Sequence, residues 1–332
     1  MSGQHETTRE YGKHEHQAAA FDSGTDQPVP IIFDTDFSPD VDDVGALAIL
    51  HAFANRGEAE ILGVVISSGD TYAARAVDTV NTYYNRSEIP IGITLNPTVV
   101  TDSLYTRALA LNFPNHLQDD NAPDAVKVYR QILAAQPDHS TTIVCVGFLT
   151  NLHNLLDSNP DVISELSGLE LAKTKVSRLV IMGGNYPDST SHPVGAEYNF
   201  AMDAESTCVV IREWPTPIIF CGFEVGEDII TGAILQERTP PENPVRVAYT
   251  LYNGGGGRNS WDLVTVHYAV RGSAGGYQLC LGRNEVTKEG KNRWDISDES
   301  KQHAYILKTV SKENIENAID NLLVHLPQRV SR

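Results

Sequence analysis

Short apolar runs alternate along this chain with longer stretches of helical spacing. The first run, Ile31 to Phe33, ends in a polar turn that leads at once into a helix-favouring apolar stretch from Val44 to Leu50. Short apolar runs bounded by turn residues are typical of buried strands, and longer periodic stretches are typical of helices. The same pattern predicts strands at 60–67, 89–93, 141–147, 177–184 and 217–222, and helices at 72–84, 124–135, 148–156 and 203–214. This alternation predicts a single-domain, Rossmann-like α/β fold, with a mostly parallel central sheet and helices on both faces.

The last third of the chain is less regular. Four consecutive glycines at 254–257 predict a loop, and a helix is expected at 262–270. Residues 277–282 and 305–310 predict a terminal hairpin or edge strands, and Ser311 precedes a predicted amphipathic helix at 312–325. No repeat or linker divides 29–332, so one domain is expected there. Residues 1–28 are polar and lack the apolar core of a signal peptide, which predicts a disordered tail.

Charge and cysteine content narrow the range of partners. The net charge of −18 over 332 residues argues against nucleic acid and anionic membranes, because both are polyanions. No apolar run approaches the length of a membrane span. The four cysteines are far apart and show no paired spacing, which favours free thiols and a reducing compartment. We therefore expect a soluble, cytoplasmic protein.

The turn after the first strand is unusually acidic. Five aspartates fall within ten residues, namely Asp34, Asp36, Asp40, Asp42 and Asp43. A strand followed directly by a helix places them at the carboxyl end of a sheet strand, where open α/β folds bind ligands. Helix capping and the helix dipole explain two of the five. The others repel one another unless a cation lies among them, and hard divalent cations prefer oxygen ligands. The turn therefore predicts a metal or catalytic site.

Three later features carry polar side chains, two of them directly after predicted strands and one at the start of a predicted helix. They are Leu149-Thr150-Asn151, Ala196-Glu-Tyr-Asn199 after Met182-Gly-Gly, and Asp262 at a helix start. In this order, together with the acidic turn, they resemble the nucleoside hydrolase family of the inosine–uridine preferring type over about residues 29–325. The resemblance implies a nucleoside hydrolase-like domain at 29–332 that cleaves the N-glycosidic bond of ribonucleosides with Ca²⁺, giving ribose and free base.

The resemblance also implies roles for individual residues. Asp36 would bind calcium and deprotonate the attacking water, and Asp43 and Asp262 would complete the carboxylate ligands. Thr150 would contribute its backbone carbonyl to the metal. The substrate would be held by Asp42, Asp70, Glu197 and Asn199. Members of the family are usually homodimers or homotetramers, which is the expectation here.

Five further residues are possible members of the site. Asp34 would support it, and Asp40 would compete as a ligand because two extra residues separate Asp36 from the later pair of aspartates. Trp261 occupies a position where the family often has a histidine that protonates the base, and an indole would instead stack on the base. His192 in the loop before the glutamate motif is a spare acid. Glu224 follows a predicted strand.

Two other functions remain open from the sequence. A phosphatase of the HAD type would use Asp34 as nucleophile and Asp36 as acid and base, although the second acid pair follows only six residues later. A catalytically silent ribose- or nucleoside-binding protein of the same fold is the other, because Trp261 replaces the histidine. The sequence leaves the preference for purine or pyrimidine open.

Overall fold

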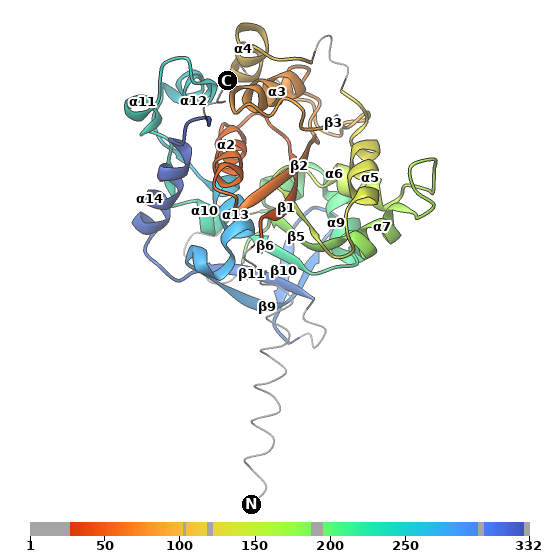
Figure 1. The fold of residues 1–332 in the computed structure, drawn as a ribbon. Helices are drawn as coiled ribbons and strands as arrows, with labels where there is room; N and C mark the ends of the chain where they lie inside the picture. The colour runs from red at the N-terminus through yellow and green to blue at the C-terminus, as the bar shows by residue number, and fades with distance from the viewer. Residues whose placement is uncertain (1–26, 102–103, 118–121, 187–194, 298–301, 329–332) are drawn as a thin grey trace, which may run out of the picture.

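The computed structural model describes residues 27–101, 104–117, 122–186, 195–297 and 302–328. Nearly all of the predicted tail, 1–28, lies outside these ranges. Within them, nine strands form one sheet in the order β10-β9-β11-β6-β5-β4-β1-β2-β3 (Figure 1). The bounds are β1 (Val29–Thr35), β2 (Ala59–Ile66), β3 (Ile91–Ile93), β4 (Thr141–Cys145), β5 (Val176–Met182), β6 (Ile218–Cys221), β9 (Tyr277–Val286), β10 (Asn292–Asp295) and β11 (His303–Lys308). A separate antiparallel pair joins β7 (Ile230–Thr231) to β8 (Arg258–Asn259).

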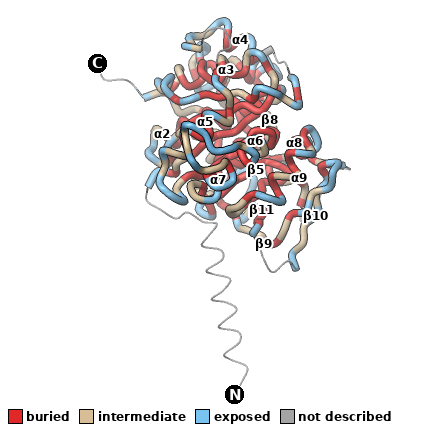
Figure 2. Tube along the Cα trace, turned by 90° about the vertical axis from the view of Figure 1, so that its right-hand side faces the viewer, coloured by how far each residue is buried: buried red, intermediate tan, exposed pale blue. Residues whose placement is uncertain are grey.

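Helices cover both faces of the sheet, as the alternating pattern predicts (Figure 1). One apolar layer lies under α2 (Asp42–Asn55), α3 (Ala73–Tyr83), α12 (Pro244–Asn253), α13 (Trp261–Arg271) and α14 (Lys312–Leu323). The other lies under α5 (Ala125–Ala135), α6 (Thr150–Leu156), α7 (Gly168–Lys175) and α9 (Ala204–Glu213). Strand β1 contributes Ile31 and Phe33 to the first layer and Ile32 to the second, so its apolar run is buried on both faces. Figure 2 shows the buried residues gathered in the interior of the molecule, with most exposed residues at its periphery.

Short helices complete the connections. They are α4 (Leu104–Asn112), α8 (Tyr198–Met202), α10 (Phe223–Gly226), α11 (Leu235–Arg238) and the 3-10 turn η1 (Gly272–Gly275). The seven strands from β11 to β3 pair in parallel, and β9 pairs antiparallel with both β11 and β10. Of the predicted terminal hairpin or edge strands, the antiparallel pairing of β9 with β11 is observed, but an edge position is wrong for β11, which lies between β9 and β6. The sequence around β11 indicates only pairing with nearby segments, whereas β11 pairs with β6, which lies about 85 positions earlier in the chain.

The order in which the strands are added to the sheet changes side at β1: β2 and β3 lie on one side of it, and β4, β5 and β6 on the other. Strand β1 pairs with β2 on one side and with β4 on the other, and both pairings are parallel. The segments that follow β1 and β4 therefore turn away from each other at the carboxyl edge of the sheet. A crevice forms at such a topological switch point. Asp36 and Val146 follow the two strands directly, so both lie at this edge.

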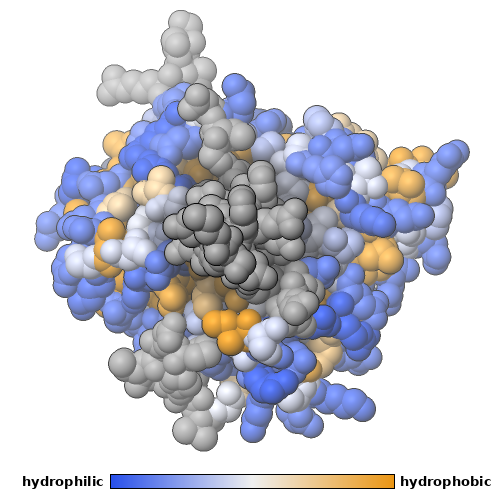
Figure 3. Space-filling view, turned by 90° about the horizontal axis from the view of Figure 1, so that it is seen from below, coloured by the Kyte–Doolittle hydropathy of each residue, from blue (hydrophilic) through white to orange (hydrophobic). Residues whose placement is uncertain are grey.

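No helix in the described ranges is both long and apolar enough to span a bilayer. Seen from below, and outside the grey residues, the surface is mostly hydrophilic, with small separate apolar areas (Figure 3). The four cysteines are free, with Cys145 and Cys221 buried.

Candidate active site

A pocket of about 290 Å³ opens at the carboxyl edge of β1 and β4. It combines residues from the first acidic turn, from the segment after β5, and from the segment between β8 and α13. The lining consists of Asp36, Pro39, Asp40, Asp42, Asp43, Val146, Met182, Glu197, Tyr198, Asn199, Phe223, Arg258, Trp261 and Asp262. The fold thus brings the early and late acidic motifs together in one cavity.

Three buried carboxylates form the centre of this pocket. Oxygen atoms of Asp42, Asp43 and Asp262 lie within 4.8 Å of one another. Asp42 and Asp43 open α2, and Asp262 lies in the first turn of α13, which packs against α2. The backbone N–H of Asp262 donates to Oδ2 of Asp42 at 3.2 Å. The two helices therefore present their amino ends to the same carboxylates, where the helix dipole favours negative charge.

The acidic turn holds its shape through its own backbone. Phe37 has a left-handed conformation, with φ of 46°, and its N–H donates to Oδ1 of Asp43 at 3.1 Å. The hydroxyl of Thr35 also donates to Oδ1 of Asp43. Ser68 after β2 donates to the carbonyl oxygen of Asp36 at 2.5 Å. These bonds fix the backbone on both sides of the Asp36 carboxylate.

Burial and mutual repulsion raise the pKa of every carboxyl in this cluster. The pKa of Asp43 rises from 3.8 to about 7, mainly because burial disfavours its charged form. Burial, Asp43 and Asp42 raise the pKa of Asp36, while burial and Asp42 raise that of Asp262. A cation among these groups would remove this repulsion. Closely spaced carboxylates in one pocket are a donor set that fits a hard divalent cation such as Ca²⁺.

Glu197 and Asn199 line the pocket beside the carboxylate cluster. Glu197 is the N-cap of α8, and its carboxylate accepts from the N–H groups of Asn199, Phe200 and Gly184 at 2.9, 3.1 and 3.2 Å. Burial nonetheless raises its pKa from 4.5 to about 7. The amide of Asn199 donates to the carbonyl of Val146 at 2.9 Å. This bond ties the segment after β5 to the end of β4.

Two predicted site residues lie outside the pocket. The hydroxyl of Thr150 donates to Oδ2 of Asp203 at 2.5 Å, and Thr150 lines a different pocket of about 480 Å³. Val146, four residues earlier, lines the acidic pocket instead. Asp70 accepts from the N–H of Tyr72 at 2.8 Å and from the hydroxyl of Thr106 at 2.7 Å. Its carboxylate therefore ties the loop after β2 to α4.

Of the other possible site residues, some also lie outside the pocket. Asp34 is fully buried, and its carboxylate accepts from Tyr129 at 2.8 Å and Asn151 at 3.0 Å. A phosphatase nucleophile must reach its substrate, so this burial argues against that function. Glu224 accepts from the N–H of Tyr186 at 3.3 Å and does not line the pocket. His192 lies outside the described residues.

Sequence reasoning missed several residues on the remaining wall. One of them is Phe223, whose ring stacks on that of the predicted Trp261 with centroids 5.2 Å apart. Trp261 also donates its indole N–H to the Phe223 carbonyl. Arg258 forms an ion pair with Asp40, so the possible ligand Asp40 already has a partner. Tyr198 completes the wall and is about half exposed. A lone arginine after a glycine run carries no motif, although its position three residues before Trp261 was a usable signal.

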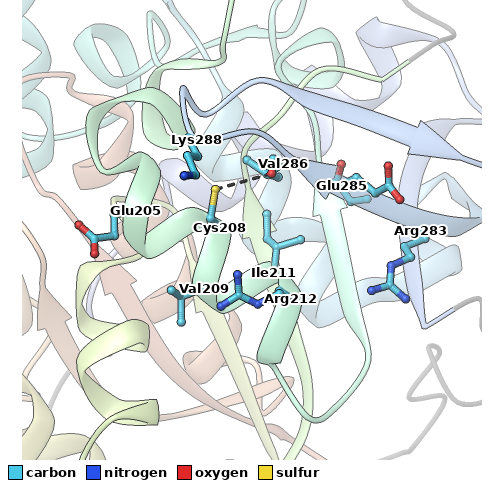
Figure 4. Close-up of a pocket in the computed structure, with 10 residues that line it drawn as sticks. Glu205, Cys208, Val209, Ile211, Arg212, Arg283, Glu285, Val286 and Lys288 are labelled. Carbon is cyan, nitrogen blue, oxygen red and sulfur yellow. Dashed lines mark hydrogen bonds between the residues drawn. The ribbon is translucent and has the colours of Figure 1, made fainter.

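A larger pocket of about 940 Å³ lies elsewhere, between α9 and β9 (Figure 4). Its wall includes Cys208, whose sulfur lies 3.6 Å from the carbonyl of Val286, and Arg212, which pairs with Glu213. Burial raises the pKa of the Cys208 thiol, which makes the thiol less reactive. None of the predicted site residues lines this pocket. Its size alone does not make it the active site.

Gly147 packs against the backbone that carries Asp36. A Cβ atom at this position would lie 2.3 Å from the Asp36 nitrogen and 2.7 Å from the Thr35 carbonyl carbon. Gly147→Ala should therefore force β1 and β4 apart at the pocket and lower the free energy of unfolding by about 1–3 kcal/mol, measured in urea. Gly256→Ala is the control, because its nearest neighbour would be 3.7 Å away. Equal stability of the two variants would contradict this prediction.

Comparisons with known proteins agree with this architecture. A family model described as inosine-uridine preferring nucleoside hydrolase matches residues 31–317. The fold is similar to an inosine-uridine preferring nucleoside hydrolase from Bacillus anthracis (TM-score 0.66, 18% identity, 89% of this chain and 99% of that chain). It is also similar to a purine-preferring ribonucleoside hydrolase from Gardnerella vaginalis (TM-score 0.66, 16% identity, 89% and 99%). A third similar structure is the type III effector protein XopQ complexed with adenosine diphosphate ribose (TM-score 0.67, 16% identity, 90% and 94%). No curated protein sequence matches this chain.

Proposed function

The chain belongs to the inosine-uridine preferring nucleoside hydrolase family, and on that premise we propose that it hydrolyses the N-glycosidic bond of ribonucleosides with bound Ca²⁺. The observation that carries this proposal is the convergence of Asp42, Asp43 and Asp262 in one pocket with Glu197 and Asn199. Such a pocket offers oxygen ligands for a cation and polar groups for a sugar in the same cavity.

Asp36, Asp43, Asp262 and the carbonyl of Val146 would hold the cation. Val146 replaces Thr150 in this proposal, because Val146 lines the pocket and Thr150 does not. When bound, the cation would supply positive charge that acidifies and orients the attacking water. Asp36 accepts a proton from that water, a task for which its position in the lining and its buried environment suit it.

The remaining polar residues hold and stabilise the ribose. Asp42 and Asn199 bind ring hydroxyls, and Glu197 at the start of α8 binds the 5′-hydroxyl. Bond cleavage develops positive charge on the sugar, and nearby carboxylates stabilise this charge most strongly in the transition state. Trp261 and Phe223 form an aromatic wall against which the planar base packs.

A catalytically silent binding protein of the same fold is the alternative. Two observations favour it: Trp261 stands where a proton-donating histidine was expected, and the similar effector XopQ was obtained with adenosine diphosphate ribose bound. In that case the pocket would bind a ribosyl compound without cleaving it. The two functions predict the same cluster of oxygen ligands and differ in turnover.

Release of ribose from a panel of nucleosides separates these functions. We expect release from at least one purine or pyrimidine nucleoside, and loss of release after chelation of calcium. Para-nitrophenyl riboside belongs in the panel because its leaving group needs no proton. Binding of ribose without turnover of any substrate would favour the silent protein. Release of phosphate from sugar phosphates, without release of ribose, would favour the phosphatase.

A further inference from the structure

The departing base poses a problem of charge in this pocket. Cleavage leaves the electron pair of the glycosidic bond on the base, which then needs a positive or hydrogen-bonding partner. Six carboxylates line the cavity, whereas Arg258 is the one cationic side chain among the described residues of its lining. The carboxylates suit the sugar, where positive charge develops, and they oppose negative charge on the base.

The other hydrogen-bond donors on this wall are mostly engaged. The indole N–H of Trp261 donates to the Phe223 carbonyl at 2.8 Å. The amide of Asn199 donates to Val146 at 2.9 Å. Tyr198 keeps its hydroxyl proton, because burial raises its pKa, but its side chain is about half exposed. It therefore remains a competitor that an experiment has to separate from Arg258.

Arg258 is held in place from three sides. Its Nε donates to both carboxylate oxygens of Asp40 at 3.0 Å, and Nη2 donates to Oδ2. Its Nη1 donates to the side-chain oxygen of Asn259 at 3.3 Å. The guanidinium lies 5.1 Å from the Trp261 ring centroid and 5.6 Å from that of Tyr252. These bonds use three of its five N–H groups and leave two for a ligand beside Trp261.

We propose that Arg258 is the catalytic residue that stabilises the departing nucleobase. This inference rests on the proposed hydrolysis. As the C1′–N bond breaks, its electron pair moves to the base, and the guanidinium donates hydrogen bonds to a ring nitrogen or exocyclic oxygen of that base. The water oxygen bonds to C1′, one water proton passes to Asp36, and the base takes its proton from solvent. Arg258 gives up no proton, since a guanidinium stays charged at all working pH values.

Substrates that differ in their leaving groups test this role. Arg258→Gln should lower kcat/KM for inosine and uridine by about 10²-fold, the loss typical of one preorganised donor. The rate with para-nitrophenyl riboside should fall by less than about 3-fold, because nitrophenolate leaves as a stable anion and needs no such donor. Arg258→Lys, which keeps the charge, should retain part of the nucleoside kcat/KM that Arg258→Gln loses. Unfolding temperature and ribose affinity, measured on each variant, exclude a general loss of structure.

Two control variants separate the charge from its surroundings. Asp40→Asn loosens the ion pair that positions Arg258 but keeps the cation, so it should lower the nucleoside rates more than the nitrophenyl riboside rate, and by less than Arg258→Gln does. Tyr198→Phe removes the competing hydroxyl and should change the rates of all substrates by a similar factor. Equal loss on nucleosides and nitrophenyl riboside in Arg258→Gln would overturn the proposal and indicate a structural role. A nucleoside-selective loss in Tyr198→Phe alone would transfer the role to Tyr198. A wild-type protein inactive on nitrophenyl riboside as well would overturn the proposed hydrolysis, and this inference with it.

Discussion

Asp36→Asn is expected to lower the kcat of ribose release by about 10³-fold, within the range that a general base contributes. The substitution keeps the size and one oxygen of the side chain but removes its capacity to accept a proton. Asp36 lines the pocket beside Asp43 and is only 6% exposed, so solvent cannot readily replace it. Ribose and free base, quantified together at saturating nucleoside and calcium, give the measurement.

The same variant also changes a proposed ligand, so calcium binding has to be measured with activity. Calorimetric titration distinguishes a variant that has lost the base from one that no longer binds calcium, and excess calcium should not restore turnover. Asp138→Asn is the matched control, because Asp138 is exposed and pairs with Lys175 far from the pocket. An Asp36→Asn protein that keeps a tenth of wild-type turnover would contradict the assignment.

Calcium is expected to stabilise the protein more at pH 7.5 than at pH 5.5. Without a cation, the folded-state pKa of Asp43 is about 7, above its ordinary value of 3.8, and the pKa of Asp36, Asp42 and Asp262 shifts in the same direction. Between about pH 4 and pH 7 the native state thus binds more protons than the unfolded state. The free energy of unfolding consequently falls as pH rises through this window, by about 1.4 kcal/mol per unit of pKa shift.

Bound calcium would reverse this loss, because it favours the deprotonated carboxylates. At a concentration of 100 Kd it adds about 2.7 kcal/mol to the free energy of unfolding. Urea unfolding with calcium or chelator at both pH values measures the effect. Asp43→Asn should stabilise the metal-free protein at pH 7.5 and abolish the response to calcium. Identical unfolding curves for the wild type with and without calcium would contradict a cation at this cluster.

The acidic turn was predictable because its signals are local and agree. A buried strand, closely spaced aspartates and a helix follow one another at 31–50, and the observed β1 and α2 match them. The helices α7 and α12 were missed although their ends carry usable signals: Ser167 and Glu170 form a capping box, and Asn243 caps α12 just before Pro244. Short helices between strands depend more on such caps than on apolar spacing.

The composition of the site was harder to predict than its location. A backbone carbonyl leaves no trace in residue type, so the sequence does not show that Val146 lines the acidic pocket and Thr150 a different one. Asp70 lies at a strand end, as a site residue would, but Thr106 and the Tyr72 N–H occupy its carboxylate. The contact of Arg258 with Asp40, a partner 218 positions earlier in the chain, appears only in the fold. Each of these facts depends on long-range packing, which local patterns do not encode.

The contact between α2 and α13 also affects how the protein unfolds. Asp42 and Asp262 touch across 220 positions of sequence, so an ion shared by their helices would act as a removable cross-link between distant parts of the chain. Closing so long a loop restricts the unfolded ensemble far more than a local contact does. Depletion of the ion would then loosen the contact between the amino ends of α2 and α13 first and expose the segment between β8 and α13 to proteases, even where the sheet itself stays intact.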